Sequence, residues 1–204
     1  MLRASHRFNN GVSMSAERRR VVPPGPRWTG SHGTIIIAGG TQMIHVTDDQ
    51  LLELSQKSFV RMDGAWFMAA ARTLGLQAAW ELDVEAWKQF SYVMGKNLKK
   101  ALIPVPVWPD SLLDAMEIFM RVLDMRGRTI TMENDSIVVR VRECEIQKAI
   151  AKAGIADCGI ATVETYKGMI RGLFGKDVEP VVEHTKNLNR GDECCEVVIR
   201  MPGK

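Results

Sequence analysis

The stretch TITMENDSIVVRVR, residues 129–142, decides the fold predicted for this chain. Polar and apolar residues alternate over residues 129–133 and again over 136–142. A period of two is typical of strands that bury one face. Asn134 and Asp135 stand between the two segments and suit a tight hairpin turn. The sequence therefore predicts a β-hairpin in the second half of the chain.

A second hairpin is predicted at the end of the chain. Residues 178–185 and 194–201 also alternate, and the polar loop 186–193 joins them. Between the two hairpins, the apolar spacing predicts helices over residues 145–153 and 160–174. Hairpins separated by helices favour an antiparallel sheet with helices packed on one face, which is an α+β fold.

Four helices are expected before the first hairpin. The first helix is expected to begin at the capping box Thr47-Asp48-Asp49-Gln50, and the second after a break at Asp63-Gly64. Asp83 and Asp110 are expected to begin the third and the fourth. Gly75 is expected to end the second helix as a C-terminal cap. The predicted fold is thus a set of N-terminal helices followed by the sheet.

The composition places the chain among ordinary globular proteins. It has 204 residues, of which 46% are apolar and 25% charged. No apolar run approaches the ~18 residues that a membrane helix needs. Four cysteines are too few for a disulfide-dense secreted scaffold. We expect a cytoplasmic protein with reduced thiols that binds neither nucleic acid nor membrane.

The first 42 residues differ from the rest in charge and composition. They hold six arginines, no lysine and a single acid, Glu17, so their net charge is +5 and residues 43–204 carry −2. The tail is rich in Gly, Pro, Ser and Arg without an amphipathic period, which predicts disorder. It is interpreted as an arm that contacts an acidic partner, as an organelle-targeting peptide, or as a gene-model extension ahead of a true start at Met43. Residues 43–204 are expected to form one domain.

Strand alternation brings a histidine and a cysteine together. In the last predicted strand, Cys195 shares the inward face with Val197 and Ile199. In the preceding strand, His184 shares a face with Val182. If these two strands pair, His184 and Cys195 lie near the mouth of the hairpin on the same side.

These two residues, with Cys144 and Cys158, form the candidate site. Three cysteines and one histidine can make a tetrahedral metal site, for which zinc or iron would be the ion. The spacings contain no C-x-x-C pair, so two other interpretations stay open. The cysteines can be small buried apolar residues, or Cys195 can be a thiolate nucleophile activated by His184.

Asp63 is the remaining candidate for chemistry. It is followed by Trp66 and Phe67 at the predicted helix break, where the three residues suit either a pocket wall or a helix cap with core aromatics. Arg140 and Arg142 share a strand face and suit either carboxylate binding or a solvated surface.

Two groups of residues carry a resemblance to a known family. They are C-E-I-Q at 144–147 with Gly154, Cys158, Thr165-Tyr166 and Cys195, and the run RMDGAWF at 61–67 with Gly75-Leu76 and LDVEAW at 82–87. Through them, residues 44–202 resemble an uncharacterised prokaryotic family labelled L-2-amino-thiazoline-4-carboxylic acid hydrolase-like. The family carries cysteines at the positions of Cys144, Cys158 and Cys195, and His184 stands in place of a further cysteine.

The C-terminal portion is also similar to 4-vinyl reductase-like ligand-binding domains, through Gly191-Asp192 and the strand led by Cys195. That resemblance implies a small-molecule or lipid cavity between helices and sheet.

The expected function is small-molecule binding, with a homodimer as the expected oligomer. As an enzyme, the protein would open a thiazoline or cyclic amidine ring by metal-assisted hydrolysis. Cys144, Cys158, His184 and Cys195 would hold the metal, and Asp63, His184 and Cys195 are the predicted catalytic residues. The alternative is a non-catalytic ligand-binding sensor or interaction domain.

Overall fold

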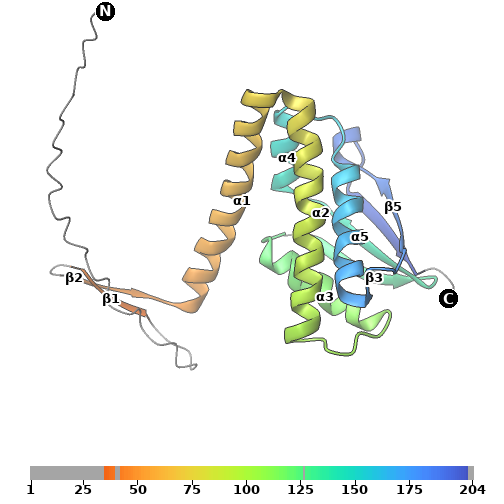
Figure 1. Cartoon of the computed structure of the whole chain (residues 1–204), viewed down its shortest axis with the longest axis horizontal. Coiled ribbons are helices and arrows are strands. Elements are labelled where there is room, and N and C mark those ends of the chain that lie inside the picture. The colour runs from red at the N-terminus through yellow and green to blue at the C-terminus, as the bar shows by residue number, and fades with distance from the viewer. Residues whose placement is uncertain (1–34, 40–41, 126, 202–204) are drawn as a thin grey trace, which may run out of the picture.

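Helices and strands follow one another in groups along the chain (Figure 1). The computed structural model describes residues 35–39, 42–125 and 127–201. Its helices are α1 (Asp48–Leu74), α2 (Leu76–Ala101), α3 (Asp110–Val122), α4 (Glu145–Lys152) and α5 (Gly159–Phe174), with a short 3-10 helix η1 (Leu188–Arg190). Its strands are β1 (Ile35–Gly39), β2 (Gln42–Val46), β3 (Arg128–Glu133), β4 (Ser136–Val141), β5 (Val181–Lys186) and β6 (Cys195–Arg200).

The predicted tail, residues 1–42, lies mostly outside the described residues. Its last part forms β1, which pairs antiparallel with β2 in a two-stranded sheet of its own. This hairpin spans the predicted boundary at residue 43. The predictions of disorder, targeting or a later start for residues 1–34 stay predictions.

The capping box at the start of α1 is confirmed. The Gln50 N–H donates to Thr47 Oγ1 at 3.2 Å, and the Thr47 N–H donates to Gln50 Oε1 at 2.9 Å. The predicted break at Asp63-Gly64 is wrong, because α1 continues through it to Leu74. A glycine inside a helix costs only about 1 kcal/mol relative to alanine, and the good helix formers around it outweigh that cost.

The start of the next helix is also earlier than predicted. Gly75 ends α1 as expected, and its φ of 89° lets the chain turn directly into α2 at Leu76. Asp83 therefore lies inside α2 and does not cap a helix. Three helices, rather than four, separate β2 from β3 within the described residues.

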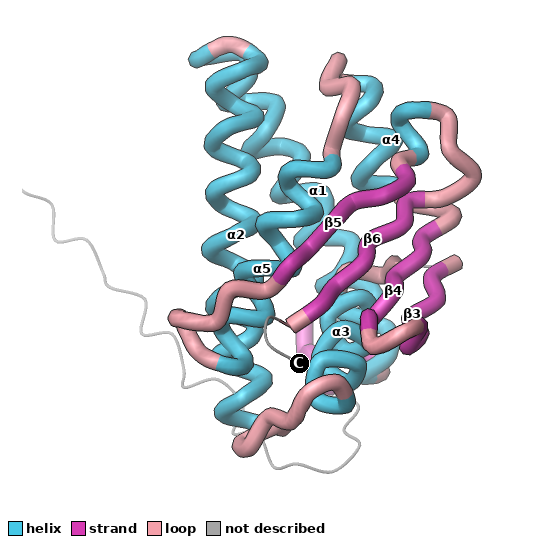
Figure 2. The backbone as a smooth tube through the Cα atoms, turned by 90° about the vertical axis from the view of Figure 1, so that its right-hand side faces the viewer, coloured by secondary structure: helices cyan, strands magenta, loops and turns pink. Residues whose placement is uncertain are grey.

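The sheet confirms the predicted α+β class. Its strands are all antiparallel, in the order β3-β4-β6-β5. Asn134 and Asp135 join β3 to β4 with φ values of 46° and 61°, the left-handed conformation of a two-residue hairpin turn. The two hairpins meet where β4 pairs with β6, Val139 opposite Val197. Figure 2 shows the helices gathered on one side of this sheet.

The main core lies between the sheet and the helices α2, α3 and α5. Alternate residues of β4 and β6 point into it, among them Ile137, Val139, Val197 and Ile199, each at most 2% exposed. Each such fully buried side chain stabilises the fold by about 1.5–3 kcal/mol.

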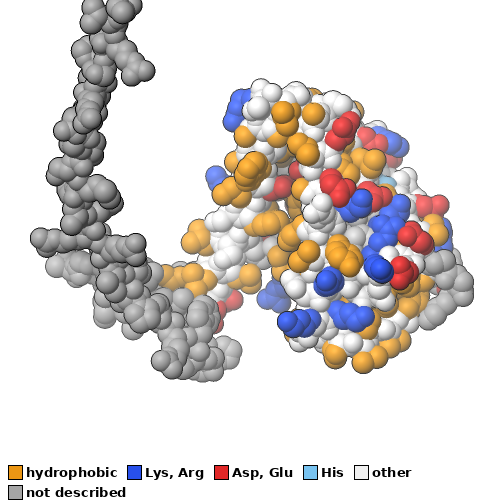
Figure 3. All heavy atoms as spheres, in the orientation of Figure 1, with side chains coloured by type: hydrophobic (Ala, Val, Ile, Leu, Met, Phe, Trp, Pro, Cys, Tyr) orange, Lys and Arg blue, Asp and Glu red, His pale blue; other side chains and the backbone are white. Residues whose placement is uncertain are grey.

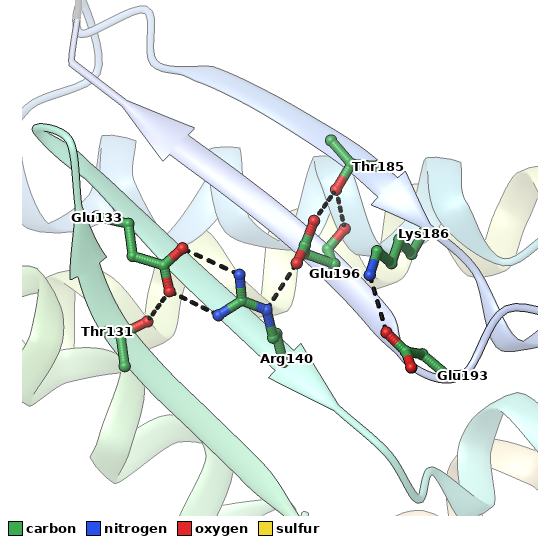
Figure 4. A network of polar contacts seen from close by, with 7 residues as sticks. All are labelled: Thr131, Glu133, Arg140, Thr185, Lys186, Glu193 and Glu196. Carbon is green, nitrogen blue, oxygen red and sulfur yellow. Dashed lines mark hydrogen bonds and ion pairs between the residues drawn. The ribbon is translucent and has the colours of Figure 1, made fainter.

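The opposite face of the sheet carries a polar network (Figure 4). The Arg140 guanidinium donates to Glu133 Oε1 and to Glu196 Oε2, both at 2.6 Å. The Thr185 hydroxyl donates to Glu196 Oε1 at 2.8 Å. Arg140 therefore links three strands on the outer face, and its donors are taken by carboxylates of this chain.

The helices α2 and α5 pack with their backbones nearly touching. A Cβ atom added at Gly95, Gly168 or Gly172 would meet atoms of the facing helix at under 3.0 Å. Ser91, which is fully buried, completes this seam of small residues and donates to the Lys88 carbonyl at 3.0 Å. The close approach fixes how α5 lies on α2, and it thereby positions the residues at the start of α5.

No helix in the described part of the chain is long and apolar enough to span a bilayer.

Candidate functional site

A cavity of about 90 Å³ lies between α2, α4, α5 and the ends of β4 and β6. Most of its lining is apolar, and three of the four cysteines border it, namely Cys144, Cys158 and Cys195. A water molecule takes up about 30 Å³ in the liquid, so the cavity has room for a small ligand group. Concave apolar sites with a few polar groups are typical of small-molecule binding.

Cys195 is the cysteine of the cavity wall whose surroundings favour ionisation. It opens β6 opposite Val141 and is half-buried. A hydrogen bond from the Cys158 thiol lowers the pKa of Cys195 well below its usual value, and His184 and the Leu188 N–H add to this against the effect of burial. The same hydrogen bond, together with burial, raises the pKa of Cys158. The contact between the two sulfur atoms therefore favours ionisation of Cys195 over ionisation of Cys158.

His184 lies behind Cys195, as the strand alternation predicts. It stands on β5 opposite Val197, next to a β-bulge. Its Nε2 is buried, and both hydrogen bonding and the electrostatic attraction of the imidazole help to lower the pKa of Cys195.

The start of α5 holds the imidazole in place. A Cβ atom at Gly159 would lie 2.6 Å from His184 Nδ1, so only glycine leaves room for the ring here. The Gly159 N–H donates to Asp157 Oδ1 at 2.7 Å. The helix start and the histidine are thus packed against each other.

Asp157 is a residue of this site that the sequence analysis missed. Its carboxylate accepts hydrogen bonds from Gly159 and from Asn187 Nδ2, the latter at 2.6 Å, and it forms an ion pair with Arg190. Partial burial acts to raise the pKa of Asp157, but the Gly159 N–H, Arg190 and His184 hold it below its usual value. The carboxylate therefore ties η1 to α5 beside His184. The sequence marks Asp157 as a site residue only by its position, since it is an acid directly before Cys158.

Cys144 and Tyr166 complete the polar part of the cavity wall. Cys144 caps α4 by accepting the Gln147 N–H at 3.3 Å, and burial raises the pKa of its thiol. Burial also raises the pKa of Tyr166, and negative charge on the neighbouring cysteines Cys144 and Cys195 would add to the shift. Both groups therefore stay neutral at physiological pH. Cys194 is buried and does not line this cavity.

The predicted metal ligands have donor types that suit zinc or iron. Cys144, Cys158 and Cys195 border one cavity, with His184 behind them. Among the residues that the structure describes, however, no three His, Cys, Asp or Glu side chains converge closely enough to hold an ion. Cys158 and Cys195 instead share a hydrogen bond. The arrangement is therefore not a preformed metal centre.

Asp63 lies apart from the cysteines. It lines a separate groove between α1 and α2, where it faces Asp83. Asp83 borders both the groove and the cysteine cavity, which the sequence analysis did not anticipate. Of the two interpretations of this segment, a core position is wrong for Trp66, which is 71% exposed and lines the groove.

The fold and the cavity define an α+β domain with a candidate small-molecule site between its helices and its sheet. The chain belongs to DUF6125, a family of unknown function, whose model matches residues 44–188. The match falls within the predicted range of 44–202. No curated protein matches the chain, so no named homologue supports the resemblance to the hydrolase-like family or to the 4-vinyl reductase-like domains.

Proposed function

We propose that this protein binds a small, mainly apolar molecule in the cavity beside Cys195. The observation that carries the proposal is an apolar cavity on whose wall Cys195 meets Cys158, with His184 close enough to both hydrogen-bond to Cys195 and help lower its pKa. A thiolate in such surroundings engages an electrophilic carbon or a hydrogen-bond donor of the ligand. The proposal keeps the ligand-binding part of the sequence-based expectation.

Two hydroxyl groups add polar contacts for the ligand. Thr165 and Tyr166 line the cavity, and neither hydroxyl is hydrogen-bonded to another described residue. A ligand with a ring nitrogen or a carbonyl oxygen would accept from them. This recognition suits a small heterocycle better than a pure hydrocarbon.

His184 interacts with Cys195 and, electrostatically, with Asp157. This succession of a thiol, an imidazole and a carboxylate favours a catalytic version of the same site. The thiolate would add to the electrophilic carbon of a thiazoline or cyclic amidine, and the electron pair of the C=N bond would pass to the ring nitrogen. That nitrogen takes a proton carried by His184. The bond from the same carbon to the ring sulfur of the thiazoline, or to the second ring nitrogen of the cyclic amidine, then breaks, so the ring opens while the carbon stays bonded to Cys195. Water adds to this carbon, and the Cys195 thiolate leaves as the opened product is released. In this version the thiolate, not a metal, activates the ring. The resemblance to the thiazoline-carboxylic acid hydrolase-like family supports this substrate class.

A cavity-filling variant tests the binding proposal. Ala161 is buried and lines the cavity, so Ala161→Leu fills it, whereas Ala149→Leu adds the same side chain on the exposed face of α4. We expect a panel of small five-membered heterocycles to shift the amide NMR signals of cavity residues in the wild type and in Ala149→Leu. Ala161→Leu should lose these shifts. Equal shifts in all three proteins would refute the cavity as the site.

The catalytic version and the metal prediction have their own measurements. Incubation with 2-amino-thiazoline-4-carboxylic acid should give ring-opened product with the wild type and none with Cys195→Ser. Binding without turnover would instead favour the sensor alternative. Elemental analysis of the purified chain tests zinc and iron directly, since about one ion per chain would mean that the thiols and the imidazole rearrange around a metal.

A further inference from the structure

The groove between α1 and α2 is larger than the cysteine cavity and differs from it in chemistry. Its volume is about 620 Å³, within the range of about 300–1,000 Å³ that small-molecule sites have. Its aromatic lining residues come from both helices, and they are Phe59, Trp66, Phe67, Trp87 and Phe90. Figure 3 shows that hydrophobic side chains also remain exposed along α1. The groove is therefore an apolar surface with room for a ligand.

Two carboxylates interrupt this apolar surface. Asp63 of α1 and Asp83 of α2 are both half-buried, and among the described residues they are the only charged ones in the lining. Neither forms an ion pair with any residue that the structure describes. Burial raises the pKa of both, although a hydrogen bond with Trp87 acts the other way on Asp63. Two neighbouring acids without a cation are costly in apolar surroundings.

A cation would relieve that cost, and the aromatic rings favour one with an organic body. Cations bind over the faces of tryptophan and phenylalanine rings, more strongly where water is excluded. Phe59 packs against Trp87 and Phe90, with ring centroids 6.1 and 5.1 Å apart, and this cluster closes one side of the groove. Aromatic side chains would contribute little to the binding affinity of a hydrated metal ion.

We infer that the α1–α2 groove is a second binding site, which takes an organic cation, such as an amidinium or a protonated amine, attached to an apolar group. Asp63 and Asp83 bind the charge from the two helices, and the aromatic side chains cover the apolar body. The site is independent of the proposed ligand of Cys195, although Asp83 and Trp87 border both cavities.

A matched pair of probes tests the inference on the full chain. Benzamidine carries the cation, and benzamide has nearly the same shape without the charge. In NMR titrations above neutral pH, we expect benzamidine to shift the indole N–H signals of Trp66 and Trp87, with at least tenfold lower affinity for benzamide. The signal of Trp108, which packs on Phe174 away from the groove, should stay in place.

Charge-removing variants show whether the carboxylates are responsible. The double variant Asp63→Asn and Asp83→Asn should bind benzamidine no better than benzamide. Asp114→Asn removes a carboxylate from an exposed position of α3 and should bind like the wild type. Equal binding of both probes, unchanged binding in the double variant, or no indole shift at any soluble concentration would each overturn the inference. A dimer closed through the groove would also overturn it, and size-exclusion chromatography with light scattering would reveal one.

Discussion

The helix α2 packs against two other helices in very different ways. Against α5 it forms a seam of Ser91, Gly95, Gly168 and Gly172 that leaves no room for a single additional carbon. Against α1 it leaves a groove of about 620 Å³, and α1 has no buried residue at all. In Figure 1, α1 diverges from α2 below their junction at Gly75. The first interface fixes the architecture, whereas the second leaves a surface that a ligand can occupy.

The two helix pairs differ in packing because different residue types lie between the helices. Glycine in a helix normally costs stability, but at the seam it allows contacts between backbones that any larger residue would prevent. At the groove, α1 and α2 meet through aromatic side chains such as Phe59 and Trp87, and two half-buried acids, Asp63 and Asp83, lie among them. Small residues therefore mark the rigid pair, and mixed aromatic and acidic residues mark the open one.

The largest predicted effect is at the seam. Gly172→Val would place side-chain atoms within 3.0 Å of the backbone of α2, so we expect the free energy of unfolding to fall by about 3 kcal/mol or more. The matched control is Gly64→Ala in α1, where an added Cβ has nothing within 4 Å and should stabilise the protein by roughly 0.5–1 kcal/mol. Urea unfolding of both variants measures the difference. Similar values for the two glycines would mean that the seam is not tight.

The next effect depends on pH and concerns the groove. Burial, and then the charge of Asp63, raise the pKa of Asp83 from 3.8 to about 7. The folded state therefore holds this proton more tightly than the unfolded state, and the resulting stability is complete below pH 3.8 and lost as the pH rises through about 7.

Replacing this carboxylate should remove the pH dependence that it causes. At a pH above its pKa, Asp83→Asn should be more stable than the wild type by about 1 kcal/mol, since solvent screens a half-exposed group. At low pH the two proteins should unfold alike. Thermal unfolding across this range tests the expectation, with Asp114→Asn as the control. If Asp83→Asn and Asp114→Asn show the same slope with pH, the groove does not perturb Asp83.

The smallest effect is expected on the exposed side of α1. Trp66 is 71% exposed, so Trp66→Ala should change the free energy of unfolding by no more than about 0.5 kcal/mol. The same variant should weaken benzamidine binding, because one aromatic wall of the groove is lost. A large loss of stability in chemical denaturation would show that α1 is packed more closely than this structure has it.

Much of the sheet could be predicted from the sequence. Period-two alternation identified both hairpins, and it placed Cys195 and His184 on the same side of one of them. The errors lie in the N-terminal helices, where Asp63-Gly64 and Asp83 suggest boundaries that do not exist. Capping residues also occur inside helices, and only the continuous hydrogen bonding of the whole segment distinguishes the two cases.

The candidate site could be predicted only in part. Cys195 and His184 belong to neighbouring strands, so local periodicity relates them. Asp157, Cys158 and Gly159 come from a loop and a helix start, and their approach to His184 depends on how α5 packs. Asp83 looked like a helix cap, and its place between two cavities follows from the register of α2 against its neighbours.

The sequence by itself determined the α+β class, the two hairpins and the inward orientation of Cys195, because these follow from backbone periods that repeat within a few residues. Only the tertiary structure decided the tight seam between α2 and α5, the open groove beside α1 and the meeting of Cys158 with Cys195. These features depend on contacts between residues far apart in the chain. Side-chain volume and close packing select among such contacts, and no local pattern encodes the outcome.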